Sequence, residues 1–325
     1  MSARDTVVEW AERGQISPDA LPRALEVAGA IPDGPAWRRF LSVLLLTVGA
    51  LLLAAGVVMF FAYNWDALGR HQKFALVETV FVASAAVAWF IGPARVAGQA
   101  ALLLTTLLTG ALLALIGQTY QTGADTYQLF GYWALLILPW VVVGCMPVLW
   151  LLLVALVNLT LVTYFDAFQG ALGIIGTIDN EALAWILFAL NTIVLVVWEL
   201  AARRGISWMS ERWAPRLLAI ASGACAANLA LWAVFETSGD IGPWALPAYV
   251  AWMAGAFYCY RFRIRDLFVL AGGVLSAVVV IAAALTRWLA DGDNAGAFLL
   301  IGMVVIGLSG AGAWWLRGVA AEGEA

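Results

Sequence analysis

Charged residues are scarce in this chain of 325 residues. They make up 12% of the sequence, whereas hydrophobic residues make up 64% and the mean hydropathy is +0.91. Soluble domains contain about twice that share of charged residues, roughly 25%. One compact core cannot bury so much apolar surface, so the composition excludes a water-soluble globular protein and indicates an integral membrane protein.

Histidine is almost absent, since His71 is the only one. A single imidazole excludes multi-histidine metal sites and leaves few ways to build a nucleophile–base pair. The cysteines Cys145, Cys225 and Cys259 lie in apolar stretches without a Cys-x-x-Cys pair, which is typical of small buried hydrophobic side chains. We therefore expect no metal site, no cofactor and no enzymatic activity.

Basic runs and phosphate-binding glycine motifs are also missing. The net charge is -4, and no cluster of Lys and Arg is long enough to indicate nucleic-acid binding. No Walker or dinucleotide glycine motif lies between a strand and a helix. The first apolar run begins near Phe40 and acidic residues precede it, so we expect no signal peptide.

The chain instead contains a series of apolar segments, each close to the ~20 residues that a helix needs to cross a bilayer. There are ten of them, at 40–63, 74–92, 98–117, 128–143, 147–165, 182–201, 217–235, 243–260, 267–286 and 296–316. This pattern predicts an all-α polytopic transmembrane bundle of about ten spans. We expect a cytoplasmic helical head at 1–38, the bundle at 39–317 and a cytoplasmic tail at 318–325.

The fourth and fifth segments are separated only by residues 144–147 and can be read as one long helix. The basic residues distinguish the two readings, because cytoplasmic loops are enriched in Lys and Arg. Ten spans with a cytoplasmic N-terminus place 14 basic residues inside and 3 outside, whereas merging the two segments gives 7 inside and 10 outside. We therefore predict ten spans, with both termini in the cytoplasm.

The predicted head reads as a helical hairpin. A short apolar stripe over 7–11 ends at Gly14, and Ser17 with Pro18 has the pattern of an N-cap followed by proline in the first turn. Gly29 suits the end of the second helix. The head has two open roles, which are packing against the cytoplasmic loops and docking a partner protein.

Polar residues gather at two places on the predicted outer face, at 62–66 after the first span and at 117–127 between the third and fourth spans. Their amides and hydroxyls can bind a polar solute and their carboxylates a cation, although the same residue types also form turns and helix caps. Glu78 lies inside the second span, where a carboxylate is by default a functional candidate. An ion pair of Glu78 with Arg70 or Lys73 is the structural alternative. The candidate ligand-binding residues are Asn64, Asp66, Glu78, Gln118, Tyr120, Gln121, Asp125 and Tyr127.

Other polar groups in the spans favour structural roles. Glu199 ends the sixth span close to Arg203 and Arg204, and we expect an ordinary interfacial ion pair there. Three asparagines fall near the middle of later spans: Asn158, Asn191 and Asn228. Lipid offers no hydrogen-bond partner at that depth, so these amides either join helices or line a midplane site.

The two outer motifs carry a family resemblance. The runs GVVMFFAYNWDALGRHQK (56–73) and GQTYQTGADTYQLFGYWALLILP (117–139) resemble bacterial membrane proteins of the domain-of-unknown-function 2157 family. The head sequence VVEWAERGQIS (7–17) is similar to that family's N-terminal region. The resemblance covers about residues 5–145. It implies a multi-span protein of the bacterial inner membrane, and it implies no activity, catalytic residue or ligand-binding residue.

Two functions remain open from the sequence. In the first, the protein binds or transports a small polar or cationic ligand through an outward-facing site. In the alternative, it is a non-catalytic scaffold or assembly component of the cell envelope, which agrees with the head and with the scarcity of charges in the spans. The expected partners are the lipid bilayer, a protein at the N-terminal head and a small polar ligand, and we expect no nucleic acid.

Overall fold

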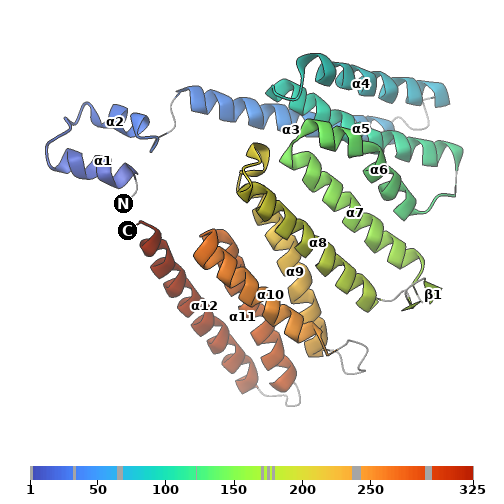
Figure 1. The fold of residues 1–325 in the computed structure, drawn as a ribbon. Coiled ribbons are helices and arrows are strands. Elements are labelled where there is room, and N and C mark those ends of the chain that lie inside the picture. Colours follow the sequence, from blue (N-terminus) through green and yellow to red (C-terminus); the bar gives the residue numbers. More distant parts are fainter. Residues whose placement is uncertain are drawn as a thin grey trace. The chain divides into compact units, whose positions relative to one another are not determined.

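The computed structural model describes residues 3–31, 34–63, 69–121, 123–169, 172–173, 176–177, 180–235, 243–289 and 295–324. Apart from a two-residue antiparallel hairpin, β1 (Leu172–Gly173) with β2 (Gly176–Thr177), the regular elements in these ranges are helices (Figure 1). The predicted all-α fold is confirmed. The chain divides into unit 1, Met1–Thr160 with Glu324–Ala325, and unit 2, Leu161–Gly323.

Each of the ten predicted segments coincides with a helix. They are α3 (Gly34–Tyr63), α4 (Arg70–Ile91), α5 (Val96–Tyr120), α6 (Thr126–Gly144), α7 (Pro147–Ala167), α8 (Asn180–Arg203), α9 (Trp213–Phe235), α10 (Ala245–Tyr258), α11 (Leu267–Leu289) and α12 (Ala295–Glu324). Among the described residues, eight of them are long and apolar enough to cross a membrane: α4 to α9, α11 and α12. Helix α10 has 14 residues, which at 1.5 Å per residue is only about 21 Å. The count of ten spans therefore stays a prediction.

The break between α6 and α7 is real. Cys145 adopts a left-handed conformation with φ +46°, and α7 begins two residues later at Pro147. A Cβ on Gly144 would lie 2.9 Å from Cδ1 of Leu149, and one on Gly131 would lie 3.4 Å from Cγ2 of Thr160. The first contact pairs the end of α6 with the start of α7, and the second pairs the first half of α6 with the second half of α7. The two helices therefore run antiparallel, and the reading as one long helix is wrong.

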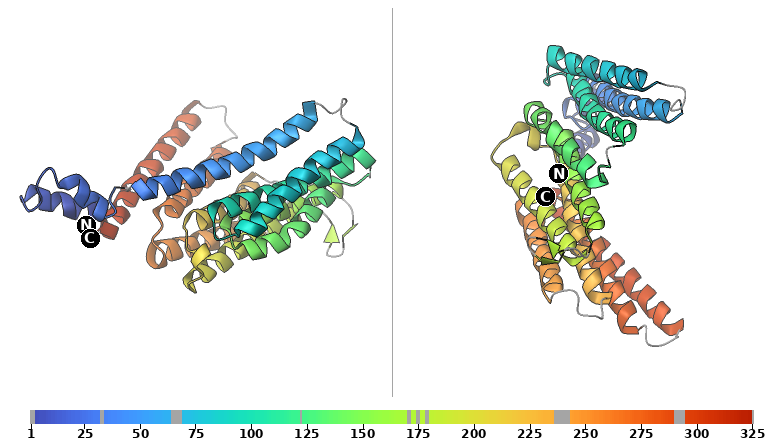
Figure 2. Two further views of the ribbon diagram at one scale, coloured as in Figure 1. Left: turned by 90° about the horizontal axis from the view of Figure 1, so that it is seen from above. Right: turned by 90° about the vertical axis from the view of Figure 1, so that its right-hand side faces the viewer.

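Helix α5 forms the centre of unit 1, where it packs against α3, α4 and α6 (Figures 1 and 2). The Oγ of Ser84 on α4 lies 2.9 Å from Oγ1 of Thr105 on α5. The indole Nε1 of Trp133 on α6 donates to the backbone oxygen of Thr106 at 2.8 Å. A Cβ on Gly110 would lie 2.5 Å from the same indole ring. Small residues and interhelical hydrogen bonds are what hold helices together where lipid provides no hydrophobic driving force.

Helix α9 has the corresponding place in unit 2, where it packs against α8, α10 and α11. The Oγ of Ser222 on α9 lies 2.8 Å from Oγ1 of Thr192 on α8 and accepts a hydrogen bond from Nε1 of Trp252 on α10, also at 2.8 Å. Asn191 is buried, and its amide donates to the oxygen of Leu187 in its own helix at 2.8 Å. The polar groups of this bundle therefore join helices to one another or to their own backbone.

Helix α12 packs along α10 and α11 through a few side chains. The ring of Trp315 stacks on that of Phe257 with 5.7 Å between centroids. A Cβ on Gly312 would clash with Cγ1 of Val274, so α12 approaches α11 closely there. The predicted tail at 318–325 continues α12 as far as Glu324, which forms part of a regular helix.

The head is a helical hairpin, as predicted, made of α1 (Ala3–Glu12) and α2 (Leu21–Val27) (Figure 1). The predicted start of its second helix is wrong. Pro18 and the two residues after it form a turn, and the helix begins only at Leu21. Pro22 explains the difference, because proline is tolerated in the first turn of a helix and breaks its interior.

Candidate functional site

The ends of α4, α5 and α6 meet at one edge of unit 1, where the polar 117–127 motif lies. Arg70 begins α4, and its guanidinium carbon lies 5.2 Å from the ring centroid of Tyr120 at the end of α5. Phe74 lies 6.0 Å from the same ring, measured between centroids. Tyr120 is 56% exposed. The structure thus places a cation over an accessible aromatic face, a contact that contributes about 0.5–1 kcal/mol at exposed sites.

The turn that leads into α6 carries polar side chains, and the one at its N-cap forms no hydrogen bond to the helix backbone. Gln121 has φ +45° and ends α5, and Asp125 is the N-cap residue of α6. The Asp125 carboxylate forms no capping hydrogen bond to the first turn, and it has no ion pair within the described part of the chain. Gln118, Gln121 and Asp125 are exposed. Tyr127 is half-buried and its hydroxyl oxygen accepts a hydrogen bond from Nε2 of Gln128 at 3.2 Å.

Glu78 lies further along α4, eight residues from Arg70, which is about 12 Å along the helix axis. It is exposed in an open groove formed with Ala75, Val82 and other small residues of the same helix. Its carboxylate forms no hydrogen bond or ion pair with any residue that the structure describes, so the predicted pairs with Arg70 and Lys73 are absent. The cause is helical geometry. Residues five apart lie about 140° apart around an α-helix, and Lys73 is buried on a different side of α4.

The structure therefore sorts the candidate residues into separate places. Gln118, Tyr120, Gln121, Asp125 and Tyr127 lie at the meeting helix ends. Glu78 lies about 12 Å away along α4. Asn64 and Asp66 lie outside the described residues.

A second polar site, which the sequence analysis did not find, lies in unit 2. Arg212 bridges two carboxylates there. Its Nη1 donates to both oxygens of Glu199 at 2.9 and 3.1 Å, and its Nε and Nη2 donate to Oδ2 of Asp266 at 3.1 and 3.0 Å. The Nε of Arg216 also donates to Asp266, at 3.0 and 3.2 Å. The Tyr260 hydroxyl donates to Oε1 of Glu199 at 2.9 Å. We call these five residues the arginine–carboxylate cluster.

Local structure at four helix ends assembles this cluster. Arg212 and Arg216 are four residues apart at the start of α9 and so lie on one face of the chain. Tyr260 lies in a π-helical turn, η2 (Cys259–Arg263), that follows α10. Asp266 caps α11, and its Oδ1 accepts a hydrogen bond from the backbone N–H of Phe268 at 3.1 Å. The cluster thus joins α8, α9, η2 and α11.

The predicted partners of Glu199 were wrong. Arg203 and Arg204 are exposed at the end of α8, whereas Glu199 is only 9% exposed and binds Arg212. The guanidinium of Arg212 satisfies both carboxylate oxygens at once. That contact is stronger than a single exposed pair on the helix surface.

Both carboxylates of the cluster are bound by arginines. Asp266 is 3% exposed. Burial on its own raises the pKa of Asp266, but hydrogen bonds from Arg216 and Arg212 outweigh it and hold that pKa below its usual value. Burial opposes the charge of Arg212 in the same way, and its bonds to Glu199 and Asp266 raise its pKa in compensation. Two arginines balance two carboxylates, so the cluster fastens helix ends and leaves no charged group poised for a reaction.

Comparison with known proteins bears on the first of these two sites. A family model described as "Predicted membrane protein (DUF2157)" matches residues 8–150. The match includes Glu78 and the 117–127 motif, whereas the arginine–carboxylate cluster lies outside it. No curated protein and no solved structure gave a significant match to the chain. The resemblance drawn from the outer motifs is confirmed, and residues 8–150 of this chain match the DUF2157 family of predicted membrane proteins.

Proposed function

We propose that this membrane protein binds a small cationic ligand at Glu78, with the polar helix ends of unit 1 as its entry, and that it transports or senses that ligand. The observation that carries the proposal is the unpaired carboxylate itself. Glu78 lies within a 22-residue apolar helix and has no partner in the described part of the chain.

A carboxylate at such a depth is costly unless its charge is neutralised. The buried carboxylates of unit 2 differ from Glu78, because Glu199 and Asp266 are each bound by an arginine. Glu78 lacks that arrangement. A proton, a bound cation or a further helix must therefore balance its charge, and small neighbours such as Ala75 and Ala83 leave room beside it.

The helix ends supply a polar route to this carboxylate. The distribution of basic residues favours an outward-facing position for the Arg70 end of α4. The exposed Asp125 adds negative charge there, and the exposed amides of Gln118 and Gln121 can hydrogen-bond a polar or cationic solute.

The experiment compares the thermal stability of the purified protein in mild detergent against inorganic cations and small organic amines. A ligand that binds the folded state at about 100 times its Kd stabilises it by ~2.7 kcal/mol. We expect at least one cation to stabilise the wild type and to have no effect on Glu78→Gln. Glu12→Gln is the matched control, because it removes an exposed carboxylate of the head and leaves Glu78 and the helix ends intact. An equal shift in wild type and Glu78→Gln, or no shift with any cation, overturns the proposal.

The head favours a second function, a scaffold role. Its hairpin leaves apolar side chains uncovered, with Trp10 45% and Val27 79% exposed. Such residues suit docking of a protein partner. If this is their role, Val27→Glu lowers the apparent mass of the complex extracted from its native membrane and leaves cation binding unchanged. An unchanged mass argues against the scaffold function.

A further inference from the structure

We propose that a groove in unit 2, between α9 and α11, binds one acyl chain of an anionic phospholipid whose phosphate contacts Arg216. This inference rests on different residues from the proposed function and does not depend on it. It concerns the face of the bundle that lies beside the arginine–carboxylate cluster.

The groove has a volume of about 560 Å³ and runs along two helices. Arg216 and Phe268 line one end, and Ala227 and Val279 line the other. Eleven residues separate the two ends on each helix, which is about 16 Å at 1.5 Å per residue. The hydrocarbon core of a bilayer is about 30 Å thick, so the groove is as long as one leaflet is deep.

The wall of the groove is apolar because its polar atoms are already paired. Nε1 of Trp252 donates to Ser222, and Ser276 shares a hydrogen bond of 3.0 Å with Tyr249. Small residues create the space, and a Cβ on Gly272 would meet no atom within 4 Å. Away from Arg216, the groove therefore offers an acyl chain an apolar surface on which the described polar side chains are paired.

Arg216 makes the groove amphipathic. Its side chain is 41% exposed. Its Nε is bound to Asp266, and its guanidinium carbon lies 5.5 Å from the ring centroid of Phe268. Neither Nη1 nor Nη2 donates a hydrogen bond to any described residue. The guanidinium is thus held in place with two donor groups free at the head of an apolar groove, a geometry that suits a phosphate.

The charge around this end of unit 2 also favours an anion. Exposed arginines follow α8 and η2 on the chain: Arg203, Arg204, Arg263 and Arg265. The carboxylates of the cluster are already paired with Arg212 and Arg216. Basic residues near a membrane surface attract anionic lipids. An anionic headgroup is therefore favoured over a zwitterionic one.

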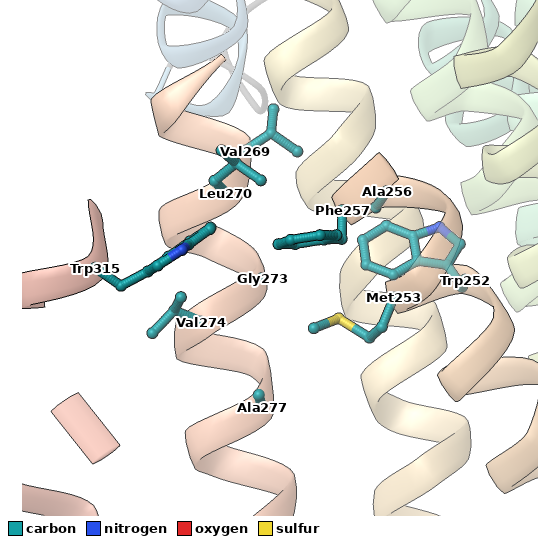
Figure 3. Close-up of a pocket in the computed structure, with 10 residues that line it drawn as sticks. All are labelled: Trp252, Met253, Ala256, Phe257, Val269, Leu270, Gly273, Val274, Ala277 and Trp315. Atoms are coloured by element: carbon teal, nitrogen blue, oxygen red, sulfur yellow. The ribbon is translucent and has the colours of Figure 1, made fainter. Parts of the chain in front are cut away.

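A neighbouring cavity in unit 2 differs from the groove in having no charged residue among its described lining residues. It has a volume of about 220 Å³ and lies between α10, α11 and α12, where the rings of Phe257 and Trp315 point toward one another (Figure 3). Trp252, Val269 and Gly273 line both spaces. None of the described residues that line the cavity is charged, so they offer a lipid headgroup no ion-pair partner.

The test measures lipid binding to the purified full chain by native mass spectrometry, with phosphatidylglycerol, phosphatidylcholine and inorganic phosphate as probes. We expect the wild type to bind phosphatidylglycerol about tenfold more tightly than phosphatidylcholine, equivalent to ~1.4 kcal/mol. Arg216→Gln is expected to lose this preference, with Arg287→Gln as its control, because Arg287 is exposed in the last turn of α11, away from Phe268. Gly272→Leu fills the groove without touching the cluster and is expected to weaken binding of both lipids. Gly307→Leu is its control, because a Cβ there also meets no atom within 4 Å.

Three outcomes overturn the inference. The first is a headgroup preference that survives Arg216→Gln. The second is lipid binding that is unchanged in Gly272→Leu. If this variant alters only the oligomeric state, a second copy of the chain occupies the groove in place of a lipid. The third is inorganic phosphate binding as tightly as phosphatidylglycerol, because the site then takes free anions and the acyl chain contributes nothing.

Discussion

Removing Arg212 tests the arginine–carboxylate cluster most severely. In Arg212→Met the chain keeps a side chain of similar length and loses both ion pairs that Arg212 makes. Asp266 keeps Arg216, but Glu199 keeps only the Tyr260 hydroxyl. The variant therefore leaves one buried carboxylate without a cation.

The expected cost follows from burial. Removing one partner of a fully buried ion pair costs about 3–5 kcal/mol. Glu199 and Asp266 are buried, but the Arg212 side chain is 32% exposed, so solvent screens part of this. We expect a loss of about 2–3 kcal/mol, which lowers the Tm of a unit of 150–250 residues by about 5–10 °C.

The assay is thermal unfolding of the full chain in mild detergent at neutral pH. Arg204→Met is the matched control, since Arg204 is exposed and surface changes usually stay within about 0.5 kcal/mol. In the double variant Glu199→Met with Arg212→Met, part of the stability is expected to return, because no uncompensated charge remains. A Tm of Arg212→Met equal to that of Arg204→Met refutes the reasoning.

Three further predictions follow from the described contacts. Because the folded-state pKa of Asp266 is lowered, its contribution to stability is complete above about pH 4 and is lost as the pH falls through that lower pKa. A pH series of unfolding experiments should show the loss beginning at higher pH in Arg212→Met, and identical profiles would contradict it. Gly110→Ala places a Cβ 2.5 Å from the Trp133 indole and is expected to lower the free energy of unfolding by about 1–3 kcal/mol. Gly272→Ala is the control and is expected to be near neutral. Equal Tm values for the two variants would show that α6 can move away from α5. The predicted orientation places Cys145, which is exposed, in the cytoplasm. An impermeant maleimide should therefore label Cys145 only after the cells are permeabilised, whereas a Gln121→Cys variant should react in intact cells. The reverse labelling pattern would show that the topology is inverted.

The sequence predicts the helices of this protein well, because their signals are local. Apolar runs of span length, the glycine and proline around Cys145 and the balance of basic residues are all read along the chain. The start of α2 was misplaced because Pro18 and Pro22 both fit the first turn of a helix. A helix that began at Pro18 would have Pro22 in its interior, where proline breaks the helix, so α2 begins at Leu21.

Pairings between distant side chains could not be read in this way. Arg212 and Asp266 are 54 residues apart in the chain, and they meet because α9 packs against both α8 and α11. A nearby candidate such as Arg203 was the natural expectation for Glu199 from the sequence. Glu78 is the opposite case. The sequence identified it as an unusual carboxylate, and the structure leaves it without the ion pairs that would have explained it.

Glu78 is exposed and has no ion-pair partner among the described residues, and a hydrophobic carbodiimide tests directly whether it binds a cation. This reagent modifies protonated carboxyl groups in apolar surroundings, and peptide mass spectrometry locates the adduct. We expect Glu78 to be modified and the paired carboxylates Glu199 and Asp266 to stay unmodified. We also expect a bound cation to slow modification of Glu78 in proportion to its occupancy. An unreactive Glu78, or a rate that no cation changes, would contradict cation binding at this residue.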